Sequence, residues 1–270
     1  MRVLRAGPLS MTVELGELTV TMLSDGETGM PLTHLRGPDG EALAEAALSG
    51  ADVVDGRLRL PVRAFLVQGP EGSLLIDAGA GDAWHAVLGR LPEALAEAGV
   101  SANAVTAVAL THTHVDHLGG LVGADGGLAV PNALRVFVPT EELSDFRAEP
   151  RMIPVLPLLV PLEQGDSPLR GVTAINAPGH SAGHMAFLVE GRLLIWGDIV
   201  HHAAVQFARP EVTWAYDADA EVARASRLAL MAQAAEAGWI VAGAHLPVPG
   251  IGHITRDGAG YAFHPAGSPP

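Results

Sequence analysis

The feature that most constrains this chain is a cluster of histidine and aspartate side chains directly after an apolar run. Residues 105–110 are apolar, and the following Thr-His-Thr-His-Val-Asp-His-Leu-Gly-Gly places His112, His114, Asp116 and His117 close together. Alternate side chains of an extended segment share a face, so His112 and His114 point the same way. Burying so many imidazoles without partners is costly. The cluster therefore indicates a site for two adjacent divalent cations rather than a polar loop that happens to be rich in histidine.

Three later positions also place a metal-ligand side chain at the end of a predicted strand. His180 lies in a Pro-Gly-His turn, Asp198 follows the apolar run Leu-Leu-Ile-Trp-Gly, and His245 ends the run Trp-Ile-Val-Ala-Gly-Ala. Each of them alone would more often be structural. Together with the cluster at 112–117 they predict one site, in which the two oxygens of the Asp198 carboxylate can bridge two metals.

Composition limits the chemistry of this site. The chain has no cysteine, so a thiolate nucleophile and sulfur ligands are excluded and only nitrogen and oxygen donors remain. All 16 basic residues are arginine, which excludes Schiff-base chemistry on a lysine. The formal charge of −14 disfavours nucleic acid as a partner, because such binding depends on basic side chains. The expected partner is a small-molecule substrate.

The sequence shows neither a secretory signal nor a membrane span. Residues 1–20 are interrupted by arginine and glutamate, and the longest apolar run, 152–162, contains three prolines and is too short to cross a bilayer. We therefore expect a cytoplasmic protein without a membrane partner.

The order of strand-like and helix-like segments predicts an α/β fold in which sheets pack together with helices outside. We expect a single domain over residues 1–270, with 1–57 forming an N-terminal strand and rim loops. The segments 25–40 and 150–168 are rich in glycine or proline and are predicted to be loops at the pocket rim. Strands are predicted at 18–23, 62–68, 73–77, 104–110, 134–138, 171–176, 184–190 and 192–196, and helices at 42–48, 84–98 and 219–237.

The order His-x-His-x-Asp-His, Pro-Gly-His, Gly-Asp and a late histidine resembles the metallo-β-lactamase superfamily. The segments 197–207, 243–253 and 258–263 are more specifically similar to methyl parathion hydrolase and its relatives. The resemblance runs from about residue 62 to 265, and it implies an αββα sandwich with a dinuclear site along one edge.

Carried over to this chain, the resemblance implies two divalent cations, with zinc as the default and cobalt, manganese, nickel or iron as alternatives. The first would be held by His112, His114 and His180, the second by Asp116, His117 and His245, and Asp198 would be shared. It also implies a homodimer, in which the apolar segment 153–162 could be covered by the second copy.

Several other side chains have expected places around these ligands. Asp77 ends an early strand, where it could support a ligand or cap a turn. His184 is expected to pack beside the ligands, and His201 should face the pocket while His202 points away. His253 is expected to be structural, and His34, His85 and His264 should lie at the surface or the rim.

The function expected from these features is hydrolysis of a lactone or ester by a metal-bridging hydroxide, with promiscuous phosphotriesterase activity. Asp198, Asp116 and His201 are the catalytic candidates, and Asp198 or His201 could protonate a leaving alkoxide. The interval 121–177 offers only Phe137 and Phe146 as aromatics for a leaving-group pocket. The alternatives are a thioesterase similar to glyoxalase II and a non-catalytic metal-binding scaffold.

Overall fold

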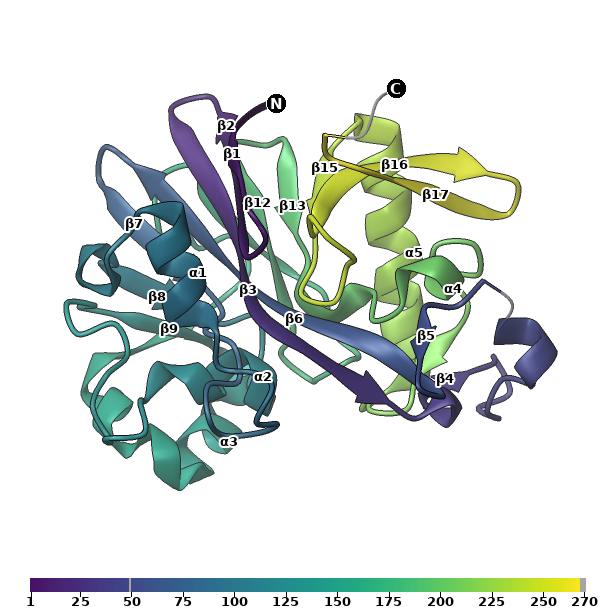
Figure 1. Ribbon diagram of the computed structural model, residues 1–270, viewed down its shortest axis with the longest axis horizontal. Helices are drawn as coiled ribbons and strands as arrows, with labels where there is room; N and C mark the ends of the chain where they lie inside the picture. The colour runs from purple at the N-terminus through teal and green to yellow at the C-terminus, as the bar shows by residue number, and fades with distance from the viewer. Residues whose placement is uncertain (49, 268–270) are drawn as a thin grey trace.

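Two mixed β-sheets pack face to face, with helices on their outer faces, in a computed structural model that describes residues 1–48 and 50–267 (Figure 1). The first sheet runs in the order β1 (Arg2–Ala6), β2 (Ser10–Leu15), β3 (Leu18–Met30), β6 (Arg57–Gly69), β7 (Gly72–Ile76), β8 (Ala107–Ala109), β9 (Val136–Pro139) and β10 (Leu159–Leu162), with β5 (Val53–Val54) paired to β6. The second runs β11 (Val172–Asn176), β12 (Met185–Val189), β13 (Leu193–Ile195), β15 (Ile240–Ala242), β16 (Ile251–Asp257) and β17 (Gly260–Pro265). A separate pair joins β4 (Leu35–Arg36) and β14 (Thr213–Trp214).

The core between the sheets comes from strand residues that alternate inward. Val20, Phe65 and Ile76 of the first sheet meet Phe187 and Ile195 of the second, and all of them are buried. This alternation is what a strand period of two residues dictates when one face of each sheet is covered by the other.

A helix covers the outer face of each sheet. α1 (Leu91–Ala98) packs Leu91 and Leu95 on the first sheet, and α5 (Ala220–Ala237) packs Met231 on the second. The remaining helices are α2 (Val115–Leu118), α3 (Leu143–Ala148) and α4 (Ala203–Gln206), with 3-10 turns η1 (Leu32–His34), η2 (Glu45–Leu48), η3 (Ala102–Ala104), η4 (Gly119–Leu121), η5 (Thr140–Glu142), η6 (Pro150–Leu158) and η7 (Gly197–Ile199). The layers are therefore helix, sheet, sheet and helix, which confirms the predicted αββα sandwich.

The predicted bounds are confirmed for α5 and are wrong for the helix that contains α1. α5 begins after Asp219, whose side chain accepts from two backbone N–H groups of the first turn, and it ends at Gly238 in the left-handed conformation, as its sequence predicts. The helix expected at 84–98 is wrong in its first half. Residues 84–90 form turns, because Gly89 has φ +87° and Pro92 favours the first helical turn.

The two predicted loops are also largely structured. Residues 25–30 belong to β3, because they pair with 58–62 of β6 despite their glycine and aspartate content. Residues 150–162 form η6 and β10, and the former turns Met152 and Val155 into the core. The predicted helix at 42–48 is only the short turn η2.

The long strands β3 and β6 extend together past the body of the first sheet, towards β4 and β5 (Figure 1). Across this extension Thr28 pairs with Leu60 and Met30 with Leu58. The extension brings Met30 and Leu60 to the wall of a pocket in which side chains of both sheets meet. Within residues 1–48 and 50–267, no helix combines the length and the apolar character needed to cross a membrane.

Candidate metal centre

The histidine-aspartate cluster follows β8, at the edge of the first sheet. Thr111 and His112 leave the strand, and His114 then stands immediately before the short helix α2, which carries Asp116 and His117. All of these side chains except His114, which is half-buried, lie in the interior. The turn of α2 therefore sends the second pair of donors to a position beside the first pair.

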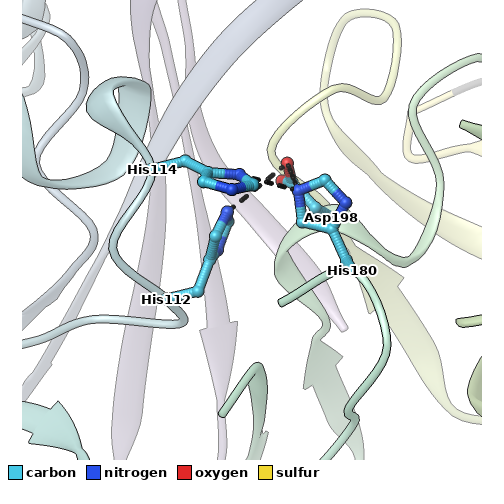
Figure 2. A group of neighbouring side chains, drawn as sticks. All are labelled: His112, His114, His180 and Asp198. Carbon is cyan, nitrogen blue, oxygen red and sulfur yellow. Dashed lines mark hydrogen bonds and ion pairs between the residues drawn. The ribbon is translucent and has the colours of Figure 1, made fainter. Parts of the chain in front are cut away.

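The second sheet supplies the other three predicted side chains at the ends of its strands. His180 follows β11, Asp198 lies in η7 after β13, and His245 follows β15. β13 and β15 are parallel neighbours, so their carboxyl ends bring Asp198 and His245 to the same edge. Figure 2 shows His112 and His114 converging on His180 and Asp198 from the opposite sheet.

The seven side chains form two groups of possible metal ligands that share Asp198. In the first group His180 Nε2 lies 2.9 Å from His114 Nδ1 and 3.2 Å from Asp198 Oδ2, and His112 Nε2 lies 3.8 Å from the same oxygen.

The second group contacts both oxygens of the same carboxylate. His117 Nε2 is 3.1 Å from Asp198 Oδ1 and His245 Nε2 is 3.1 Å from Asp198 Oδ2, while each nitrogen also lies within 4 Å of Asp116 Oδ2. These are the two sets of side chains that the resemblance named, and their binding of metal ions stays a prediction.

The outward nitrogen of each of three imidazoles has an acceptor outside the cluster. His117 Nδ1 lies 2.8 Å from Asp77 Oδ2, and His180 Nδ1 lies 2.9 Å from Asp217 Oδ1. His245 Nδ1 donates to a backbone carbonyl at 2.6 Å. With its proton on Nδ1, each neutral ring turns a bare Nε2 inward, which is the form that binds a metal.

The Thr111 hydroxyl extends this support. It lies 2.9 Å from Asp77 Oδ2, to which it can donate, and 3.0 Å from His112 Nδ1, from which it can accept. Asp77 also accepts the backbone N–H of Thr111. Asp77 therefore positions two histidines of the cluster, His117 directly and His112 through the threonine.

The buried carboxylates of this cluster stabilise positive charge on the groups around them. Burial works to lower the pKa of His180, but Asp198 and Asp217 outweigh it and raise that pKa to about 9. Burial works to raise the pKa of Asp198, but His117 and His245 hold it well below its ordinary value. Either protons on the histidines or bound cations can neutralise the negative charge of these carboxylates.

The donor set fits two divalent cations. His112 Nε2, His117 Nε2 and Asp198 Oδ1 are buried and make no hydrogen bond within the described part of the chain, although the last two atoms lie 3.1 Å apart. Such atoms are costly unless something binds them. Imidazole nitrogen and carboxylate oxygen are also the ligands that zinc and its neighbours in the first transition row accept.

Three further histidines lie where the sequence predicted them. His184 donates through Nδ1 to the Ala177 carbonyl and accepts the Asp198 backbone N–H at Nε2, so it fixes the loop that carries the shared carboxylate. His201 lies 3.3 Å from Asp198 Oδ2 and stacks on Trp214 at 4.8 Å between ring centroids. His202 points away and reaches a backbone carbonyl at 3.3 Å, as predicted.

A pocket of about 200 Å³ opens above the cluster. Apart from ligand residues and His201, its walls are Met30, Leu60, Trp84, Val115, Trp214 and Tyr216. The interval 121–177 contributes no aromatic to this pocket, because Phe137 and Phe146 are buried in the two cores beside the first sheet, and the pocket takes its aromatic side chains from other segments. The predicted rim segment 150–168 contributes no described residue to this pocket, whereas the segment 25–40 contributes Met30.

Sequence reasoning missed Asp217, Trp84, Trp214 and Tyr216. Asp217 stands just before the N-cap of α5 and has no motif around it, so only its contact with His180 identifies it. The three aromatics come from segments that are far apart in the chain and meet only at the pocket.

The chain is thus a helix-sheet-sheet-helix sandwich that carries a candidate metal centre, a buried cluster of histidine and aspartate, at one edge. The family model of the metallo-β-lactamase superfamily matches residues 57–245, and the chain belongs to this superfamily. A search of curated proteins found no match.

Among solved structures, the chain is similar to a hydrolase of the β-lactamase superfamily, AbOPH, with 28% identity and a TM-score of 0.85 over 98% of this chain and 100% of that one. It is also similar to AidC, a dizinc quorum-quenching lactonase solved with the product N-hexanoyl-L-homoserine, with 26% identity and a TM-score of 0.83 over 97% and 99%. A probable metal-dependent hydrolase from Staphylococcus aureus shares 20% identity and shows the fold alone, with a TM-score of 0.80 over 95% and 99%.

Proposed function

We propose that this chain is a dinuclear metal-dependent hydrolase that opens lactones or cleaves esters. The observation that carries the proposal is the convergence of two buried donor groups on the single carboxylate of Asp198, at the floor of a pocket with apolar and aromatic walls. The similarity to a dizinc lactonase at 26% identity over nearly the whole of both chains supports the substrate class.

The proposed ligands are the seven residues predicted from the sequence. His112, His114 and His180 would hold one cation, Asp116, His117 and His245 the other, and Asp198 both. When bound, two divalent cations supply Lewis-acid polarisation of a substrate oxygen and a hydroxide nucleophile at neutral pH. Zinc is the proposed metal because the donors are imidazole and carboxylate.

His201 is proposed to act as a hydrogen-bond donor to the substrate. Burial lowers its pKa to about 3, so the ring is neutral at pH 7. Stacking on Trp214 and on His245 fixes the ring plane, and neither of its nitrogens has another hydrogen-bond partner within the described residues. A neutral N–H at the pocket wall can stabilise a developing oxyanion, whereas the ionised Asp198 would take the proton that the attacking nucleophile releases and pass it to the leaving group.

Phosphotriesterase activity is proposed as a secondary activity. An aryloxide leaves without protonation, so such a substrate needs only the metals and a pocket that receives an aromatic leaving group. Trp84, Trp214 and Tyr216 provide such walls. The apparent shortage of aromatics in the sequence therefore does not count against this activity.

The other readings have less support. A glyoxalase II-like thioesterase would need a group that binds the carboxylates of glutathione, and no arginine or lysine is among the described residues that line the pocket above the cluster. A non-catalytic scaffold would be expected to have lost ligands, whereas all seven side chains are together. The homodimer remains a prediction. A second copy could cover less of the apolar segment 153–162 than expected, because Val155 is buried in the chain's own core while Ile153 is 64% exposed. The cytoplasmic location and the single domain also remain predictions.

The test is metal reconstitution followed by rate measurements. Metal-free protein would be loaded with zinc, cobalt or manganese and assayed on a γ-lactone, an acyl-homoserine lactone, an aryl ester, paraoxon and S-lactoylglutathione. The variants His112→Ala and Asp198→Ala should lose turnover, while His253→Ala, at an exposed position on β16, serves as the matched control. A dominant thioester rate, or no metal-dependent turnover, would refute the proposal.

A further inference from the structure

A second and larger cavity lies behind the metal pocket. Its volume is about 510 Å³, against about 200 Å³ for the pocket above the ligands. Sites for small organic ligands commonly have about 300–1,000 Å³. The metal pocket alone is therefore small for such a ligand, whereas the second cavity has a suitable size.

Trp84 lies on the wall of both cavities. Beside it, the segment 78–81 and the glycines that follow α2 are in tight backbone contact, since a Cβ on Gly120 would lie 2.0 Å from the Ala78 carbonyl oxygen. The half-buried indole of Trp84 is the side chain that the two linings share among the described residues, so a ligand that occupies both cavities must contact it.

The lining of the second cavity is apolar. Leu91 and Leu95 of α1 form one wall, and Leu121, Val122 and Val130 form another. No arginine occurs among the described residues that line it, and the whole chain has no lysine.

The two carboxylates in the lining are already engaged. Asp25 accepts the backbone N–H groups of Ala80, Gly89 and Leu91, and Asp82 pairs with Arg151. His85 is the remaining titratable side chain among the described residues of the lining, and neither arginine nor lysine stands there to bind a glutathione carboxylate. The cavity therefore favours a hydrocarbon chain.

We propose that this cavity receives the unbranched apolar arm of the substrate, with the indole of Trp84 as the contact between the arm and the reacting group. The inference rests on the proposed hydrolysis of lactones or esters and narrows it to substrates that carry a long acyl or alkyl chain. The reacting carbonyl stays over the metal ligands, and the chain passes Trp84 into the space beside α1.

Burial of hydrocarbon sets the expected size of the effect. Each methylene that leaves water should strengthen binding by about fourfold. Along a series from N-butanoyl to N-decanoyl homoserine lactone, KM should fall and kcat/KM should rise with every added pair of carbons. A short γ-lactone without an arm should show none of this gain.

The test combines this series with variants that fill the cavity. Ala129→Phe, or Ala102→Phe if the first does not fold, places a ring in the lining and should flatten the dependence of KM on chain length. Ala148→Phe, on the exposed face of α3, is the matched control and should keep it. If both filling variants fold and retain the full dependence on chain length, the inference is overturned.

A binding measurement separates this inference from the proposed function. Methyl NMR signals of Leu91, Leu95 and Val130 would be followed during titration with 1-decanol, which has no group that reacts at the metal centre. Shifts that 1-butanol does not produce, and that disappear in Ala129→Phe, support the cavity assignment even if no lactone is turned over. Lactone turnover without such shifts and without dependence on chain length would leave the proposed function intact and refute the cavity assignment. If the signals shift with protein concentration and not with 1-decanol, the cavity is covered by a second copy of the chain, and the cavity assignment is refuted.

Discussion

Replacing Asp217 with asparagine tests whether this buried carboxylate orients His180 for metal binding. Asp217 Oδ1 lies 2.9 Å from His180 Nδ1, and Oδ2 accepts the Trp214 backbone N–H at 2.9 Å. An asparagine presents an acceptor on one side and a donor on the other. The asparagine can therefore accept from only one of the two donors, His180 Nδ1–H or the Trp214 backbone N–H. The other donor then faces the amide NH₂ of the asparagine.

The magnitude follows from these two contacts. Loss of a partner that orients a metal-bound histidine typically costs about 10-fold to 100-fold in metal affinity. A buried donor left without an acceptor costs about 1–3 kcal/mol of stability. Arg227, whose Nη2 lies 3.7 Å from Asp217, keeps its hydrogen bonds to three backbone carbonyls, so the charge of the arginine retains partners in the variant.

The assay is competition for zinc against a chromophoric chelator, with urea denaturation of the metal-free protein in parallel. The control is Asp219→Asn, two positions along the same segment. Asp219 caps α5 from the surface, and asparagine caps a helix about as well as aspartate. A folded Asp217→Asn protein whose zinc affinity falls by less than about threefold would show that the Asp217–His180 contact does not orient the ligand.

Three further predictions address the charge of the cluster and the segments around it. Burial is outweighed by neighbouring carboxylates at His180, whose pKa is about 9 against an ordinary 6.5, so folding of the metal-free protein takes up a proton here. Its thermal midpoint should fall between about pH 6.5 and pH 9, and less so in His180→Gln; an equal fall in both would contradict this. Asp25→Asn should cost about 1–3 kcal/mol in urea denaturation, because Asp25 accepts three backbone N–H groups of segment 80–91; an unchanged midpoint would contradict this. Gly179→Ala should prevent stable folding, since φ is +121° and a Cβ would lie 2.0 Å from the backbone of α5, whereas Gly191→Ala, in open space, should cost only about 1 kcal/mol by the same assay; similar costs would contradict this.

The fold class and the residues of the cluster could be predicted because both depend on local patterns. Apolar runs that end in glycine, histidine or aspartate marked the strands, and the ends of neighbouring strands meet at one edge of a sheet. His180, Asp198 and His245 could therefore be expected near the 112–117 cluster without knowledge of the loops between them. The superfamily is confirmed by its match over residues 57–245, while the closer likeness to methyl parathion hydrolase remains a prediction.

Two of the wrong predictions concern segments whose structure is decided by contacts outside the segment. Residues 25–30 look like a loop, but β6 pairs with them and makes them strand. Residues 84–90 have helical composition, but the close approach of Gly89 to Gly81 holds them in turns. Propensity is a weak prior, and tertiary contacts override it in both places.

The amino-acid sequence was enough to name the candidate metal ligands, to exclude cysteine sulfur and lysine, and to place the candidate ligands at the ends of strands. Only the tertiary structure decided how those donors are held and what surrounds them. The support of His180 by Asp217, the stacking of Trp214 on His201 and the cavity behind Trp84 all join segments that are distant in the chain. The physical reason is that ligand identity is a property of single residues, whereas orientation, burial and pocket shape are properties of packing between elements.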